Sequence, residues 1–184
     1  MNKTLIGVIA AIVIVVGMIF SSYNGLVAMN ENVTGKWAQV ENQLQRRNDL
    51  IPNLVNTVKG YAAHESQVFK DVADARAKLG GASTVAEASK ANGELSNALG
   101  RLLMVAEQYP DLKANSNFTQ LQDELAGTEN RIAVARKDYN SAVQSYNAKI
   151  KSLPASLYAG AFGFTARDYF KADEVAQKVP TVKF

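Results

Sequence analysis

The chain has 184 residues, of which 47% are hydrophobic and 20% charged, with a formal net charge of +3. This length accommodates one domain of about 100–200 residues with a buried core and, in addition, a short anchor. Its Lys and Arg residues are spread along the chain with only two basic doublets, so we expect no nucleic-acid partner. The absence of cysteine excludes disulfides, thiolate nucleophiles and thiolate metal sites.

The first thirty residues have the composition of a membrane anchor. The uncharged segment LIGVIAAIVIVVGMIF runs from Leu5 to Phe20, shortly after Lys3, and a spanning helix needs about 20 apolar residues. We therefore predict a single-pass transmembrane anchor over residues 1–22 and a helical bundle domain over residues 23–184. An extension of the span to about residue 29 is left open. A cleaved secretory signal is the alternative, but the segment is not followed by an A-x-A-like cleavage site.

Positive charge near the span predicts its orientation. Lys3 precedes the span, whereas Lys36 follows it beside Glu31 and Glu41. This small difference favours the first residues inside and the bulk of the chain on the extracytoplasmic side. Tyr23 lies where an interfacial aromatic residue belongs.

Apolar residues that alternate in spacing between four and three predict one long amphipathic helix from Val33 to Leu79. Twelve of the fourteen positions on this stripe are apolar or aromatic, and the period of two that a strand needs does not fit. The pair Gly80-Gly81 then ends the helix. The two charged exceptions on the stripe are Arg47 and Glu65.

Two more helices are expected further along. The second begins after a cap at Ser83 or Thr84 and ends before Pro110, and the third begins at residues 115–117 and ends at about Pro154. Short turns between long helices imply antiparallel neighbours. The predicted fold is thus all-α: an antiparallel bundle of three long helices plus a short C-terminal helical segment, four-helix-like, preceded by a transmembrane helix.

Pro52 interrupts the first of these helices. It either kinks a continuous helix or lies in the first turn of a new helix capped by Asp49. The stripe stays in phase through this point, which favours the kink. Equal lengths suggest that residues 52–79 pair with residues 84–109.

The charged exceptions on the stripe need partners if they are buried. Arg47, next to Arg46, and Glu65 are about 27 Å apart along one helix, so they cannot pair with each other. We expect each to contact a polar group of a neighbouring helix and so to fix the register of the bundle. A buried functional site is the alternative reading. The candidate partners are Glu107, Glu129 and Arg131.

The lone histidine, His64, precedes Glu65 in the sequence HESQV, which lacks the second histidine of an HExxH zinc site. We expect no metal and no cofactor, and the sequence supplies no glycine-rich phosphate loop and no Ser/His/Asp set. A phosphotransfer histidine on an exposed helix face remains an alternative.

Small residues and aromatic rings alternate in LPASLYAGAFGF, which is followed by ARDYF. Phe162, Phe164 and Phe170 either cover an open end of the bundle or form an exposed patch that docks a partner.

Several blocks of the chain together resemble the LemA family. They are YNGLV, WAQVENQLQRRNDLIPNLVNTVKGYAAHE, LGRLLMVAEQYPDLKAN, FTQLQDELAGTENRIAVARKDYN and an ending of the form FGF…YF…VPTVKF. The resemblance implies a membrane-tethered helical bundle with no established activity, substrate or cofactor. Genes of the family often lie near membrane metalloproteases or proteins with a TPM-type domain, which implies envelope partners. Some family descriptions place the short N-terminus outside, against the charge count.

The function expected from these features is that of a membrane-anchored, non-enzymatic scaffold or adaptor of the bacterial cell envelope. It would contact lipid through the first helix and other proteins through the bundle, and an oligomer is left open. The alternatives are a phosphorelay module that uses His64 and a hydrolase that uses Glu65 or Glu129.

Overall fold

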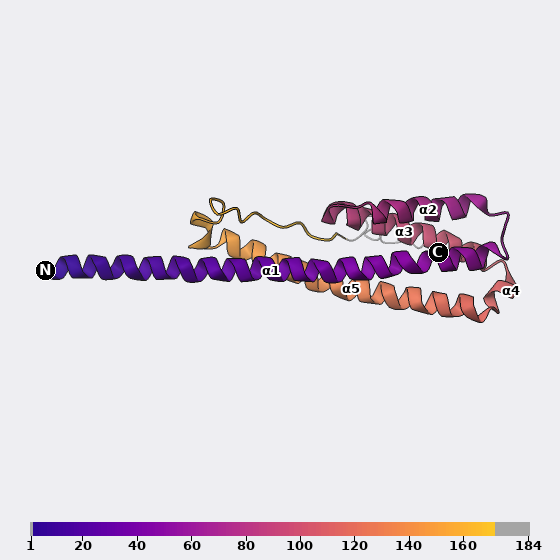
Figure 1. Cartoon of the computed structure of the whole chain (residues 1–184), viewed down its shortest axis with the longest axis horizontal. Coiled ribbons are helices and arrows are strands. Elements are labelled where there is room, and N and C mark those ends of the chain that lie inside the picture. The colour runs from indigo at the N-terminus through magenta and orange to yellow at the C-terminus, as the bar shows by residue number, and fades with distance from the viewer. Residues whose placement is uncertain (1, 172–184) are drawn as a thin grey trace, which may run out of the picture. The chain divides into compact units, whose positions relative to one another are not determined.

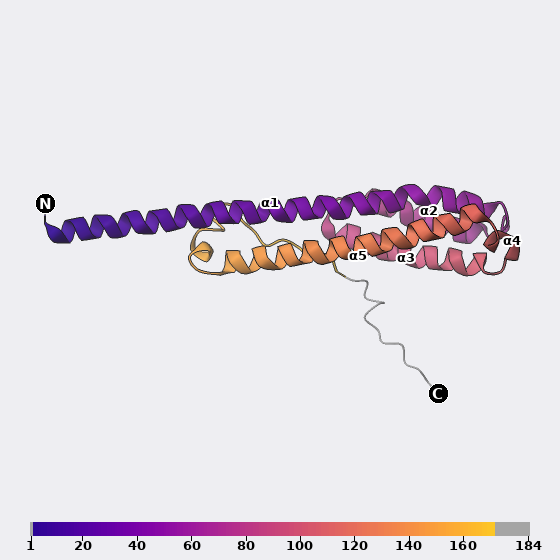
Figure 2. The same cartoon turned by 90° about the horizontal axis from the view of Figure 1, so that it is seen from below.

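The computed structural model describes residues 2–171, and this part of the chain contains helices and turns but no strand (Figures 1 and 2). The predicted all-α fold class is confirmed. A 3-10 turn, η1, and a non-helical segment follow the last long helix. In chain order the elements are α1 (Lys3–Lys59), α2 (Ser66–Gly80), α3 (Val85–Ala106), α4 (Pro110–Lys113), α5 (Ser116–Lys151) and η1 (Ala155–Leu157).

The chain divides into two compact units, and α1 and α5 contribute residues to both. We call the first the anchor unit; it comprises Met1–Ala38 and Asp138–Asp168. The second, the bundle unit, comprises Gln39–Lys137 together with residues 169–171 of the described chain.

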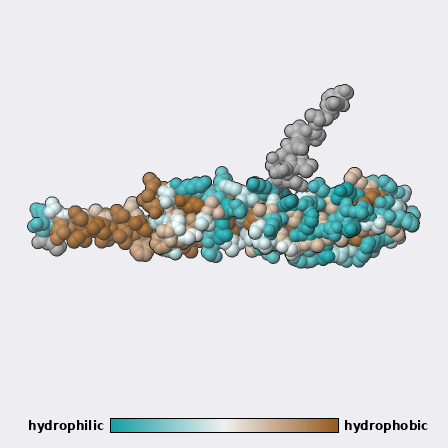
Figure 3. Space-filling model, turned by 90° about the horizontal axis from the view of Figure 1, so that it is seen from above, coloured by the Kyte–Doolittle hydropathy of each residue, from teal (hydrophilic) through white to brown (hydrophobic). Residues whose placement is uncertain are grey.

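In the anchor unit, α1 is first exposed and then buried. Its apolar side chains from Leu5 to Phe20 are exposed on every side of the helix (Figure 3). This is the one helix of the described chain that is long and apolar enough to cross a membrane. Leu26 is the first fully buried side chain of α1. The buried side chains of this unit include Leu26, Val33, Tyr139, Val143, Tyr146 and Ala159.

Antiparallel packing of α1 and α5 follows from contacts at two heights, because Lys36 meets Asp138 whereas Arg47, later on α1, meets Glu129, earlier on α5. In the anchor unit the Lys36 Nζ atom lies 3.4 Å from Asp138 Oδ2. The adjacent rings of Trp37 and Tyr139 have centroids 5.3 Å apart.

In the bundle unit, α2 packs against α3, again antiparallel, with ion pairs from Lys78 to Glu94 at 2.6 Å and from Arg101 to Asp71 at 3.2 Å. The core of this unit is built from one apolar face of each of α1, α2, α3 and α5, so α2 is the fourth long member of the bundle. Its larger members are Val40, Leu44, Ile51, Leu54, Val58, Phe69, Val72, Leu95, Leu99, Leu102, Phe118 and Ile132.

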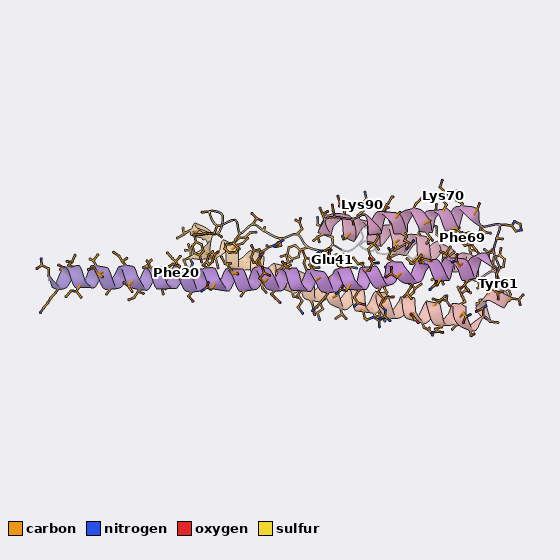
Figure 4. All side chains as sticks on the ribbon, viewed as in Figure 1. Phe20, Glu41, Tyr61, Phe69, Lys70 and Lys90 are labelled. Carbon is orange, nitrogen blue, oxygen red and sulfur yellow. The ribbon has the colours of Figure 1, made fainter. Side chains whose placement is uncertain are left out.

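The prediction of one continuous helix from Val33 to Leu79 is wrong. Helix α1 ends at Lys59, a turn follows at residues 60–65, and α2 begins at Ser66. Gly60 is a poor helix former, and the next amides bond back to the last turn of α1. The turn lets α2 fold back so that its own apolar face, with Phe69 inward and Lys70 outward, reaches the core (Figure 4).

The pairing of residues 52–79 with the second helix is wrong for the same reason, since this range is divided between α1 and α2, and α2 packs along α3. Pro52 lies inside α1, so the reading of a new helix start at Asp49 is also wrong. Asp49 instead accepts a hydrogen bond of 2.8 Å from Gln45 on the same helix.

Pro52 has no N–H to donate to the carbonyl of Asn48, the residue four positions earlier. That oxygen accepts a hydrogen bond of 3.1 Å from Nε of Arg76 on α2. The contact provides a partner for the carbonyl that the proline leaves without one, and it ties α2 to α1.

The predicted helix starts are confirmed. Thr84 caps α3 in a capping box, since its hydroxyl accepts from the Glu87 amide while the Glu87 carboxylate accepts from the Thr84 amide. Asn115 caps α5 by accepting from the amides of Asn117 and Phe118 at 2.9 and 3.2 Å. Helix α5 ends at Lys151, three residues before Pro154.

Candidate functional site: a charged cluster and an aromatic cluster

The first candidate site lies in the bundle unit, where Arg47 of α1 meets Asn92 of α3 and Glu129 of α5. We call these three residues the charged cluster. Arg47 is 6% exposed, and its Nη1 atom donates a 2.9 Å hydrogen bond to Asn92 Oδ1. The same nitrogen lies 2.7 Å from Glu129 Oε2. One guanidinium group thus links three of the four long helices.

Burial sets the electrostatics of this cluster. Desolvation lowers the pKa of Arg47 below its ordinary value, and the negative charge of Glu129 opposes this effect. A guanidinium group remains protonated in proteins all the same. Asn92 is 4% exposed, whereas the Glu129 side chain is 46% exposed and reaches solvent. The buried positive charge is therefore balanced by a carboxylate that keeps part of its hydration.

The ion pair confirms the predicted contact between Arg47 and Glu129. The other proposed partners lie elsewhere. Glu107 follows the end of α3 and pairs with Lys113 at 2.6 Å, and Arg131 is exposed beside Gly127. Neither of these two is a partner of Arg47.

Sequence reasoning missed Asn92, although a signal for it exists. Asn92 lies on the apolar stripe of α3 between Ala88 and Leu95, with spacings of four and three, and a polar residue on such a stripe needs a partner.

His64 and Glu65 do not lie on a helix, contrary to the prediction. Both belong to the turn between α1 and α2, where His64 is exposed and Glu65 is the N-cap residue of α2 without a side-chain cap bond. The prediction that Glu65 is a charged member of a helix stripe is therefore wrong. Within residues 2–171 no ion pair of the Glu65 carboxylate is found. Arg46, next to the buried Arg47, is exposed.

The second candidate site lies in the anchor unit, and we call it the aromatic cluster. The Tyr23 ring of α1 makes edge contacts with Phe162 and Phe164, at centroid distances of 5.3 and 5.5 Å. Tyr158 contacts Phe162 in turn at 6.0 Å. Phe164 is half-buried, but Phe162 is 60% exposed.

Hydrogen bonds hold the segment that follows the aromatic cluster. Arg167 donates from Nε and Nη2 to Asn30 Oδ1 at 3.1 and 2.9 Å, and its backbone exchanges two bonds of 2.9 Å with the Asn147 side chain. The hydroxyl of Tyr139 donates to the carbonyl of Asp168 at 2.7 Å, and burial raises the pKa of this hydroxyl. The segment is thus fixed to both α1 and α5.

Phe170 belongs to the bundle unit and is buried there. The guanidinium group of Arg136 lies 4.7 Å from the centre of its ring. The next residue, Lys171, offers its carbonyl to Ser89 at 2.7 Å and to Arg136 at 3.4 Å. The three phenylalanines singled out from the sequence therefore do not form one patch: Phe170 covers core, and Phe162 faces outward.

Neither cluster has the layout of a metal site. Over the described range 2–171, no three His, Asp or Glu side chains come close enough together to hold a metal ion. The charged cluster contains one carboxylate, that of Glu129, and this carboxylate already pairs with the guanidinium group of Arg47.

An apolar helix that continues without a break into an antiparallel α-helical bundle defines the class of membrane-associated helical-bundle proteins. Within that class the LemA family model matches residues 36–184, and the chain belongs to the LemA family.

Three relatives illustrate the range of similarity. Magnetosome protein MamQ 2 of Paramagnetospirillum magneticum is 31% identical over 189 residues, which cover 89% of this chain and 70% of the relative. Magnetosome protein MamQ of Magnetospirillum gryphiswaldense is 30% identical over 80% of this chain and 64% of its own length. Protein LemA of Metamycoplasma hominis is 22% identical over 89% of this chain and 77% of its own length. Family membership and the apolar part of α1 together indicate a membrane location.

Proposed function

We propose that the chain is a membrane-anchored, non-enzymatic scaffold or adaptor of the bacterial cell envelope that acts through protein–protein contacts. The observation that carries the proposal is the continuity of α1, which is one helix from its lipid-compatible segment at Leu5–Phe20 to the bundle core at Val58. A bundle that shares a helix with its anchor is tethered to the membrane with no flexible linker between the two.

The bundle unit offers surface for such contacts. Its exposed large apolar side chains lie one by one on different elements: Tyr61, Met104, Val134 and Tyr169. Single exposed apolar side chains are normal on a protein surface, and a transient interface needs no larger apolar patch, because such interfaces are only about as apolar as the rest of the surface. The partners that we propose are envelope proteins, with membrane metalloproteases and TPM-domain proteins as the first candidates.

Site-specific photo-crosslinking in intact cells tests the scaffold. A photoreactive amino acid at Met104 or Val134 of the full-length chain should trap a defined set of proteins. The same residue at Ile14, which is similarly exposed but lies in the apolar part of α1, is the matched control and should give mainly lipid adducts. If neither bundle position gives discrete protein adducts, the proposed scaffold role is contradicted.

The side of the membrane can be tested with the same chain. Because it contains no cysteine, Met104→Cys supplies a unique thiol. We propose that the bundle is extracytoplasmic, so a membrane-impermeant maleimide should label this thiol in intact spheroplasts. Labelling that requires lysis would place the bundle in the cytoplasm.

A further inference from the structure

The segment that follows α5 is unusual in composition and in exposure. Residues 152–166, SLPASLYAGAFGFTA, carry no charge and lie between Lys151 and Arg167. Three of their large apolar side chains point outward: Leu153 is 74% exposed, Leu157 79% and Phe162 60%. Exposed apolar side chains that gather within one loop usually mark a surface that contacts something apolar.

The location of this loop indicates what it contacts. Phe162 and Phe164 lie against Tyr23, three residues beyond Phe20, where the fully exposed apolar part of α1 ends. Both views of the structure show the loop beside α1 at the end of α5 that is nearer the apolar segment (Figures 1 and 2). The loop is therefore continuous with the surface of α1 that lipid surrounds.

Charge also fits a membrane surface. Lys149 and Lys151 form the basic last turn of α5, directly before the loop. No acidic residue occurs between Asp138 and Asp168 in the sequence, and none precedes Glu31. Basic residues beside an apolar loop attract anionic headgroups.

We propose that residues 152–164, which we call the interfacial loop, insert Leu153, Leu157 and Phe162 into the boundary between headgroups and acyl chains and form a second membrane contact. The depth is interfacial because irregular backbone keeps hydrogen-bonding partners there, whereas hydrocarbon would leave its amides and carbonyls unsatisfied. The inference goes beyond the scaffold role and requires only that α1 spans the bilayer.

Single-cysteine variants of the full-length chain test the loop directly. Leu157→Cys and Phe162→Cys carry a bimane label, and the protein is reconstituted in vesicles of phosphatidylcholine and phosphatidylglycerol that contain lipids spin-labelled either near the headgroup or deep in the acyl chain. We expect severalfold stronger quenching of both loop labels by the headgroup-proximal quencher than of a label at Val134→Cys. Val134 is the matched control because it is as exposed as Phe162 but belongs to the bundle unit.

Val13→Cys, in the apolar part of α1, reports on the anchor separately. Strong quenching of this label by the deep quencher shows that α1 spans the bilayer. If Val13→Cys is quenched while both loop labels behave like Val134→Cys, the interfacial loop is refuted and its apolar side chains are left for a protein partner. If Val13→Cys is not quenched, the anchor fails as well. Circular dichroism of each variant confirms that its helices are intact.

Discussion

Replacing Arg47 by alanine should strongly destabilise the bundle. The change removes a buried cation that contacts Asn92 at 2.9 Å and Glu129 at 2.7 Å. It leaves Asn92 buried without its donor, at a cost of about 1–3 kcal/mol, and removes the packing of the arginine stem. Breaking a fully buried ion pair costs about 3–5 kcal/mol, but Glu129 is half hydrated. We therefore expect a loss of about 2–4 kcal/mol.

This loss is measurable as reversible unfolding of the full-length chain in detergent micelles, followed by circular dichroism. For a chain of this size about 1 kcal/mol shifts Tm by roughly 2–4 °C, so the expected decrease is on the order of 10 °C. Arg46→Ala is the matched control, because Arg46 is exposed, and it should stay within about 0.5 kcal/mol of wild type.

A second variant separates polarity from packing. Arg47→Met combined with Asn92→Leu removes the buried guanidinium and amide groups, and the Glu129 side chain, which is 46% exposed, can turn its carboxylate to solvent. The stability of this double variant should therefore lie within about 1 kcal/mol of wild type. The reasoning is refuted if Arg47→Ala is as mild as Arg46→Ala, or if the double variant is as unstable as Arg47→Ala.

Three further predictions concern other contacts. Arg76→Ala should cost about 1–2 kcal/mol but much less in a Pro52→Ala background, where residue 52 can donate to the Asn48 carbonyl itself; a double-mutant cycle measures the coupling. Thr84→Ala should cost about 1 kcal/mol. Hydrogen bonds from the Ser83 and Thr84 amides and the Ser83 hydroxyl hold the pKa of Glu87 below its ordinary value of 4.5. The ionised Glu87 carboxylate therefore stabilises the fold fully above pH 4.5, and this contribution is lost as the pH falls through the folded-state pKa. Glu87→Gln should remove the corresponding step from a titration of stability against acid pH. Val13→Asp should reduce the carbonate-resistant membrane fraction, since Asp at the centre of a span costs about 2.5–3.5 kcal/mol.

Local chemistry made much of the fold predictable. Helix starts were found because Thr84 and Asn115 are side chains that accept from free amides, and such caps act within three residues. The buried charge at Arg47 was found because a charged residue on an apolar stripe stands out in the sequence. Its carboxylate partner could be narrowed to a few candidates, but choosing Glu129 needed the register between α1 and α5, which no local pattern contains.

The turn at residues 60–65 could not be predicted from the stripe. Apolar residues continue at helical spacing on both sides of the break, at Val58, Tyr61, Val68 and Val72, although the structure buries Ala62 and Phe69 in place of Tyr61 and Val68. The sequence pattern is thus compatible with a helix that continues as well as with one that folds back, and only the tertiary packing of α2 on α3 decides between them. Gly60 was a local signal for a helix end, but a single glycine destabilises a helix by only about 1 kcal/mol relative to alanine, which is too little to predict a break.

Helix α1 changes its pattern of exposed and buried residues along its length, although it is one continuous helix. Up to Phe20 every face is apolar and exposed, which suits lipid on all sides. From Leu26 onward burial narrows to one stripe, first at heptad spacing through Val33 and Val40, then at Leu44, Arg47, Ile51, Leu54 and Val58, where further helices cover it. The change of pattern falls at Tyr23, where the aromatic cluster forms. We propose the membrane surface at this depth, because an interfacial ring and an exposed apolar loop both suit a boundary between lipid and water.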